Sequence, residues 1–238
     1  MNVNNYPAIK LFADGADQAT MLALYEKSFI RGFTTNPTLL RHAGVANYRA
    51  FFKEVLTTIQ TKPVSIEVFS DDFDEMERQA NDIASWGANV FVKIPVLNTQ
   101  NHHAYALLNR LSAANIQLNV TAVMTLGQVS GIVAALSPEV PSLISIFAGR
   151  IADTGVNPVP TIQTALQVMK VLPRAELVWA STREILNVTQ AAEVGCHAIT
   201  VTYDILKKLS LHGYDLEEYS LDTVKMFYRD ALAAGFQL

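Results

Sequence analysis

Short apolar runs alternate with longer amphipathic segments along almost the whole chain. Short runs rich in Val, Ile, Leu and Phe are typical of strands that are buried on both faces. The runs predict eight strands, at Ala8–Ala13, Ile30–Thr34, Val64–Val68, Asn89–Ile94, Ile116–Thr121, Leu143–Phe147, Glu176–Ala180 and Ala198–Thr202. Because a longer segment follows each run, the pattern indicates parallel strands joined by helices.

The segments between the runs repeat apolar residues at the i, i+3 and i+4 spacing of a helix with one buried face. The predicted helices are Asn47–Gln60, Asp72–Trp86, His102–Ala114, Leu126–Leu136, Thr161–Leu172 and Arg183–Val194, and a further pattern runs from Asp204 towards Leu211. Gly87 and Gly195 follow two of these segments, where glycine commonly ends a helix. Asp71 and Asp72 stand where an N-cap is expected.

The alternation predicts an α/β fold of the (β/α)₈ TIM-barrel type. A doubly wound open sheet is the alternative, but it usually has fewer strands and often a glycine-rich phosphate turn. No G-x-G-x-x-G or P-loop pattern occurs in the sequence, which favours the barrel. We expect one domain over residues 1–238, with a C-terminal helical tail at about 221–238.

Composition narrows the class of protein. Of the 238 residues, 50% are hydrophobic and 17% are charged, as in a globular protein with a large core. The net charge of −4 gives no reason to expect nucleic acid or a membrane surface as partner. Cys196 is the only cysteine, which excludes an intrachain disulfide and suits a reducing cytoplasm. Residues 1–10 are polar, and no apolar stretch approaches the roughly 20 residues that span a bilayer. We therefore expect a cytoplasmic protein.

One basic residue interrupts the fourth apolar run. Lys93 lies inside Asn89–Ile94, just before Pro95, where the strand is expected to end. Its stem can cover apolar neighbours while its ammonium reaches solvent, and the segment alone favours this interpretation. The other interpretation is a buried lysine. Burial favours the neutral form of an amine, which is a nucleophile suited to forming a Schiff base with a carbonyl compound.

Polar residues recur at the ends of the predicted strands, where the active site of a barrel lies. They are Asp14, Thr34, Thr35, Asn36, Glu67, Asn119, Thr121, Ser145, Arg150, Ser181 and Arg183. Turn chemistry explains any one of them, but it does not explain such a series around a lysine. Carboxylates can move protons, hydroxyls and amides can hold sugar hydroxyls, and arginines can bind a phosphate through their planar fork.

Five motifs, in order along the chain, resemble those of the transaldolase family. Gly32–Leu39 (GFTTNPTL) resembles G-V-T-T-N-P-S-L, and Val92–Pro95 (VKIP) resembles the segment that carries the family's Schiff-base lysine. Asn119–Thr121 resembles N-x-T, Ser145–Ile151 resembles S-P-F-V-G-R-I, and Ala180–Arg183 resembles A-S-x-R. Together the motifs cover most of the chain.

The resemblance implies a class I aldolase-type barrel that uses neither a metal nor an organic cofactor. Lys93 would attack C2 of a ketose phosphate, and Asp14 would take the proton of the C4 hydroxyl. Glu67 would serve carbinolamine formation and dehydration through a water held by Thr121. The implied substrate-binding residues are Thr35, Asn36, Asn119, Ser145, Phe147, Arg150, Ser181 and Arg183. The implied reaction transfers dihydroxyacetone from a ketose phosphate, such as fructose 6-phosphate, to an aldose phosphate in the pentose phosphate pathway.

Individual residues indicate which branch of the family the chain resembles. Glu67 and Phe147 resemble the transaldolase branch, because relatives that act as fructose 6-phosphate aldolases carry Gln and Tyr there. The C-terminal tail resembles that of small-subunit members, which form decamers, so we expect a homo-oligomer. Ile146 and Thr182 depart from the motifs beside the expected phosphate pocket. Two alternatives therefore stay open: an enzyme for a sulfonated or deoxy ketose, and a non-catalytic sugar-binding barrel.

Overall fold

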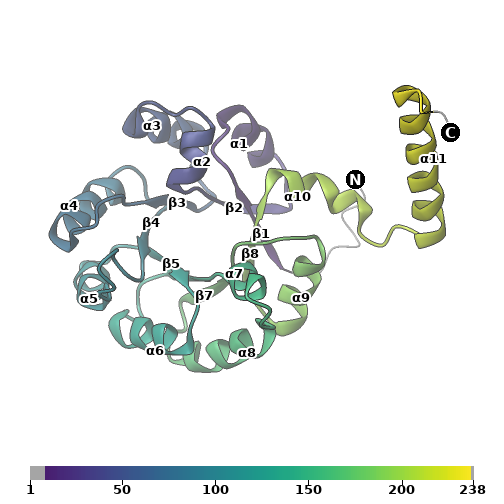
Figure 1. Ribbon diagram of the computed structural model, residues 1–238. Coiled ribbons are helices and arrows are strands. Elements are labelled where there is room, and N and C mark those ends of the chain that lie inside the picture. Colours follow the sequence, from purple (N-terminus) through teal and green to yellow (C-terminus); the bar gives the residue numbers. More distant parts are fainter. Residues whose placement is uncertain (1–8, 237–238) are drawn as a thin grey trace.

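The computed structural model, which describes residues 9–236, shows a closed barrel of eight parallel strands (Figure 1). The strands are β1 (Lys10–Asp14), β2 (Ile30–Thr34), β3 (Val64–Glu67), β4 (Val90–Pro95), β5 (Leu118–Val123), β6 (Ser142–Ile146), β7 (Ala175–Trp179) and β8 (Ala198–Thr202). β1 pairs with both β2 and β8, which closes the barrel. The TIM-barrel prediction is confirmed, and the open-sheet alternative is wrong.

The described residues form eleven helices, most of which surround the barrel as an outer ring (Figure 1). They are α1 (Gln18–Tyr25), α2 (Pro37–His42), α3 (Tyr48–Thr58), α4 (Phe73–Ala84), α5 (Tyr105–Ala113), α6 (Leu126–Ala135), α7 (Ala148–Asp153), α8 (Val159–Val168), α9 (Leu186–Val194), α10 (Tyr203–Lys207) and α11 (Leu216–Ala234), with 3₁₀ turns η2 (Met169–Val171) and η3 (Lys208–Leu211). Every predicted helix is present, and each differs from its prediction at one end or both. The sequence pattern does not predict α1, α2 and α7, which are too short to show a clear period.

Several predicted ends can be compared directly. The predictions for β2 and β8 match at both ends, whereas Ala8, the predicted start of the first strand, lies outside the described residues. Asp72 caps α4 by accepting a hydrogen bond from Glu75 N, and Gly195 caps α9 with a φ of 88°. The prediction for Gly87 is wrong, because α4 ends earlier, with Ser85 as its cap.

The barrel interior is divided along its axis. A cluster of five apolar side chains lies in its lower part, towards the N-terminal ends of the strands: Phe12, Phe91, Leu143, Val178 and Ala198. Polar side chains of the same strands lie further along, because residues two apart in a strand share a face. This register places Asp14 and Lys93 at the C-terminal ends, two residues beyond Phe12 and Phe91.

The last helix leaves the barrel. α11 extends away from the ring of helices (Figure 1) and has no buried residue. It begins at Leu216, earlier than the tail that the sequence predicted. Within residues 9–236, no helix is long and apolar enough to cross a membrane.

Candidate active site

A cavity of about 560 Å³ opens where the strands end. It brings together ten of the twelve predicted site residues: Asp14, Asn36, Glu67, Lys93, Thr121, Ser145, Phe147, Arg150, Ser181 and Arg183. The other two, Thr35 and Asn119, are buried behind its wall. The cavity therefore occupies the position at which barrels of this kind hold their active sites.

Lys93 is buried, with 6% of its surface exposed. Its Nζ lies 2.9 Å from Glu67 Oε2 and donates a hydrogen bond to the carbonyl oxygen of Thr35 at 2.8 Å. Glu67 and Lys93 are partners in the register of β3 and β4, so both side chains point into the barrel. The interpretation in which the ammonium reaches solvent is wrong, because these two oxygens replace water around it.

Asp14 ends β1 and faces the same cavity. Its carboxylate accepts a hydrogen bond from Thr34 Oγ1 at 2.7 Å, and that oxygen lies 2.5 Å from Thr200 Oγ1. Burial raises the pKa of the Asp14 carboxyl, while the Lys93 ammonium and the Thr34 hydrogen bond oppose the rise. The net shift is upward, so Asp14 is a stronger base than an exposed aspartate.

Two small residues in the cavity wall have strained backbones. Ala122 has a φ of 59° and Ser181 a φ of 65°, a region that neither residue type favours. Ala122 lies where the β5–β6 register shifts, directly after Thr121. Thr121 Oγ1 is buried without a hydrogen-bond partner in the described part of the chain, although buried hydroxyls are normally paired. The strained backbone and the unpaired hydroxyl both indicate that this wall of the cavity is a functional site.

A hydrogen-bonded chain lies beneath the cavity. Ser145 Oγ donates to Asn119 Oδ1 at 2.8 Å, and Asn119 Nδ2 donates to Ser65 Oγ at 2.9 Å. Asn119 is fully buried, so it orients Ser145 from behind and does not itself line the cavity. Thr35 Oγ1 also turns away, towards the carbonyl oxygen of Ser65, and Thr35 meets the site only through its own carbonyl. Sequence reasoning missed Ser65, although it shares a strand face with Glu67.

Asn36 has two roles in the structure. Its side chain caps α2 by accepting a hydrogen bond from Leu39 N at 3.0 Å, which is the ordinary turn chemistry of an Asn-Pro pair. It also lines the cavity, so the cap fixes the position of its amide at the mouth. Sequence reasoning also missed Thr200 as a lining residue, although the alternating Thr200 and Thr202 of β8 both face inward.

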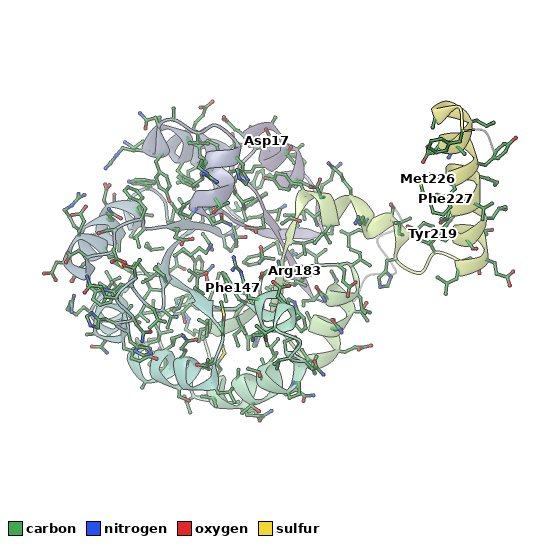
Figure 2. The ribbon with its side chains drawn as sticks, in the orientation of Figure 1. Asp17, Phe147, Arg183, Tyr219, Met226 and Phe227 are labelled. Atoms are coloured by element: carbon green, nitrogen blue, oxygen red, sulfur yellow. The ribbon has the colours of Figure 1, made fainter. Side chains whose placement is uncertain are left out.

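Two arginines lie at the rim of the cavity. Arg150 belongs to α7, and Arg183 follows β7 near the middle of the ring in Figure 2. Arg183 Nε and Nη2 donate to Asp153 Oδ1 and Oδ2 at 2.9 and 2.5 Å. These bonds hold the pKa of Asp153 below its usual value. The planar fork that the sequence predicts for a phosphate therefore already binds a carboxylate.

Close packing positions this rim. A Cβ atom on Gly149 would lie 1.7 Å from the carbonyl oxygen of Ser181, so only glycine lets α7 approach the end of β7. Thr182 lines the cavity, and its hydroxyl donates to the carbonyl oxygen of Thr200 at 2.6 Å. Ile146, expected beside the phosphate pocket, is instead buried in the core because its side chain points out of the barrel towards the helices.

The fold and the cavity define a TIM barrel with a buried lysine and two carboxylates at the end where such barrels carry out catalysis. A lysine in this setting is suited to covalent chemistry with carbonyl compounds.

The sequence matches the family described as Transaldolase/Fructose-6-phosphate aldolase over residues 11–238. A probable transaldolase of Dehalococcoides mccartyi is 28% identical over 205 residues, 86% of this chain and 91% of that protein. Probable transaldolase 2 of Listeria monocytogenes is 32% identical over 205 residues, 86% of this chain and 89% of that protein. The chain belongs to the transaldolase/fructose-6-phosphate aldolase family and is a transaldolase-type enzyme.

Among solved structures, a putative dihydrodipicolinate synthase family protein from Coccidioides immitis resembles the chain with a TM-score of 0.61. The match covers 95% of this chain and 78% of that one, at 12% identity. At this identity the likeness concerns the barrel fold alone.

Proposed function

We propose that the enzyme is a transaldolase of the pentose phosphate pathway, which moves a dihydroxyacetone unit from a ketose phosphate, such as fructose 6-phosphate, to an aldose phosphate. The observation that carries this proposal is the buried contact of 2.9 Å between Lys93 Nζ and Glu67 Oε2, in a cavity that Asp14 shares. Glu67 stabilises the ammonium when the site is empty. It is also placed to accept a proton from Nζ when a carbonyl group arrives, which frees the amine for attack.

The first half-reaction makes a covalent bond to the enzyme. Lys93 Nζ attacks C2 of the ketose, and the resulting carbinolamine loses water to form a protonated Schiff base. Glu67 gives a proton to the departing hydroxyl, directly or through a water that the unpaired Thr121 hydroxyl can hold. The Schiff base then withdraws electrons from the neighbouring carbon–carbon bond.

Asp14 completes the cleavage. It accepts the proton of the C4 hydroxyl as the C3–C4 bond breaks, the aldose leaves, and the electron pair moves into an enamine on Lys93. An incoming aldose phosphate is attacked by the enamine carbon, Asp14 returns the proton, and water releases the product from Lys93. The raised pKa of Asp14 suits a group that takes and returns a proton in each cycle.

The other residues that line the cavity fall into two chemical groups, neutral hydrogen-bonding residues and arginines. Ser145, held by Asn119, and Asn36, held by its helix cap, offer neutral hydrogen-bonding groups for the sugar hydroxyls. Arg150 and Arg183 supply positive charge at the rim for the terminal phosphate. The Asp153 carboxylate on Arg183 favours one open alternative, a donor with a less charged terminal group such as a sulfonate.

Lys93 is expected to carry the intermediate. Borohydride treatment in the presence of fructose 6-phosphate should attach a reduced dihydroxyacetone to Lys93, which peptide mass spectrometry locates. Lys93→Met should lose the adduct and the transferase activity, whereas Lys53→Met on the exposed face of α3 should keep both. An adduct that persists in Lys93→Met would disprove the assignment. Failure of every donor–acceptor pair to react would favour the non-catalytic barrel.

Asp14 is expected to set the acid limb of the pH–rate profile. Only the carboxylate accepts the C4 proton, so kcat/KM should fall as the pH drops through the pKa of Asp14, which lies above the ordinary value of 3.8. Thr34→Val removes a hydrogen bond that stabilises the carboxylate, so the limb should move to higher pH. Thr34→Ser keeps the hydroxyl and should leave the limb in place. An acid limb at the same pH in the unmodified protein, Thr34→Val and Thr34→Ser would contradict the role of Asp14 as the proton acceptor.

Asp153 is expected to compete with the substrate phosphate for Arg183. Asp153→Asn keeps the shape and removes the charge, so KM for fructose 6-phosphate should fall by about two- to fivefold, the range of an exposed ion pair. KM for unphosphorylated fructose should not change. Glu77→Gln, which breaks a similar surface ion pair with Arg110, is the control. A rise in KM for the phosphorylated donor, or equal changes for both donors, would show that Asp153 does not compete.

We also propose that α11 joins copies of this chain. The side chains of Glu218, Asp222, Lys225 and Arg229 form a polar stripe, and most of the remaining surface of the helix is apolar. Tyr219, Met226 and Phe227 are exposed on this helix, which stands apart from the barrel (Figure 2). The helix is about 28 Å long, and no residue along it is buried against the described part of its own chain.

The assembly can be tested by light scattering after size-exclusion chromatography. The unmodified protein should form a multimer, and Phe227→Asp should shift it to smaller species because a carboxylate would be buried at the contact. Lys225→Gln, on the polar stripe, should leave the mass unchanged. A monomeric unmodified protein, or an unaltered multimer of Phe227→Asp, would contradict the proposal.

A further inference from the structure

A second cavity, of about 530 Å³, lies at the opposite end of the barrel. Residues at the starts of β1, β2, β6 and β7, together with the segment 61–63 that leads into β3, surround it, so it faces away from the proposed catalytic site. None of the residues that line it lines the first cavity. Any ligand it binds therefore contacts a different set of side chains.

The cavity is strongly basic. Lys10, Arg31, Lys62 and Arg174 line it, and Glu176 is the one acidic residue in its described lining. Glu176 is already engaged, because its Oε1 lies 2.5 Å from Lys10 Nζ. Three positive charges are left over in a chain whose net charge is −4. The local field therefore has the opposite sign to that of the whole protein, as in sites that attract anions.

Apart from the Lys10–Glu176 pair, none of the other three cations forms an ion pair with a carboxylate of the described residues, although Glu26 acts on Lys62 at longer range. Lys62 Nζ donates to the carbonyl oxygens of Tyr25 and Lys27, and Arg174 Nη1 donates to that of Glu139 at 2.6 Å. Burial lowers the pKa of Lys62, and the positive charge of Arg31 lowers it further, although Tyr25 and Glu26 oppose this.

Arg31 has no such contact. Within residues 9–236 its guanidinium makes no hydrogen bond and no ion pair, so its planar fork is available to a ligand. Residues 1–8, which precede β1, contain no Asp or Glu, so they supply no carboxylate to this end of the barrel.

The inner wall of the cavity is apolar. Phe12, Phe91 and Leu143 line it, and all three belong to the cluster in the lower barrel interior. Apolar walls with a few converging polar groups are typical of small-molecule sites, and the volume lies within their usual range. A ligand that fits would place a compact anionic group between the cations and an apolar part towards the two phenylalanines.

We propose that this cavity, which we call the N-terminal cavity, binds a phosphate ester with an apolar or aromatic organic part. Arginine matches phosphate oxygens bidentately, and lysine adds a point charge without requiring a fixed angle. The N-terminal cavity is independent of the proposed transaldolase reaction, because no residue of the catalytic end contributes to it.

Isothermal titration with phenyl phosphate tests the proposal on the full-length protein. Saturable binding is expected, tighter than that of inorganic phosphate because the ring contacts the apolar wall. Arg31→Gln should weaken it on the order of tenfold, the loss expected for one charge-assisted contact. Since the Arg31 guanidinium makes no hydrogen bond and no ion pair within residues 9–236, and lies outside the catalytic cavity, this variant should keep the stability and the activity of the unmodified protein.

Two further variants separate the sites. Lys27→Gln removes an exposed charge at the same end, outside the cavity lining, and should bind phenyl phosphate normally. Arg183→Gln weakens the rim of the other cavity and should also bind normally. The proposal would be overturned if Arg183→Gln alone abolished binding, if Arg31→Gln bound as well as the unmodified protein, or if no saturable binding occurred.

Discussion

The buried pair of Lys93 and Glu67 is the interaction on which the rest of the site depends. Taking an ammonium out of water is costly, and a buried charge that loses its partner destabilises a protein by about 3–5 kcal/mol. Here β3 and β4 set the two residues opposite each other, and the Thr35 carbonyl adds a second acceptor. The register of β3 and β4 thus fixes the contact of the lysine with Glu67, the carboxylate that we propose as its proton acceptor.

The fold could be predicted because parallel strands with helices over them need continuous apolar runs, and these runs remain visible in one sequence. The ends of the predicted strands also located most of the residues that line the cavity, because side chains alternate between the two faces of a strand. Asn119 shows the limit of this reasoning. The alternation of side chains along β5 correctly places Asn119 inside the barrel. Only the structure shows that Asn119 lies deeper than Ser145, behind the cavity wall.

Other features of the site leave no mark in a sequence. The positive φ angles of Ala122 and Ser181 could not be foreseen, because glycine and asparagine are the usual signals of such angles. The pairing of Arg183 with Asp153 depends on the close approach of α7 to β7, which Gly149 permits. The helix α7 is itself too short to be recognised from its pattern. The contacts that shape the rim are therefore tertiary, and they appear only when the barrel is closed.

The exposed position of the Arg183–Asp153 pair is consistent with a site that must release its ligands. The proposed transfer requires the enzyme to bind and release two phosphorylated sugars in each cycle, so very tight phosphate binding would slow turnover. In the proposed reaction, the solvated Asp153 carboxylate would replace the leaving phosphate on Arg183 and keep the guanidinium paired at little cost in free energy. The covalent role proposed for Lys93 needs the opposite environment, one from which water is excluded. The cavity provides both environments, because Lys93 is buried between the strands whereas Arg150 and Arg183 lie at the rim.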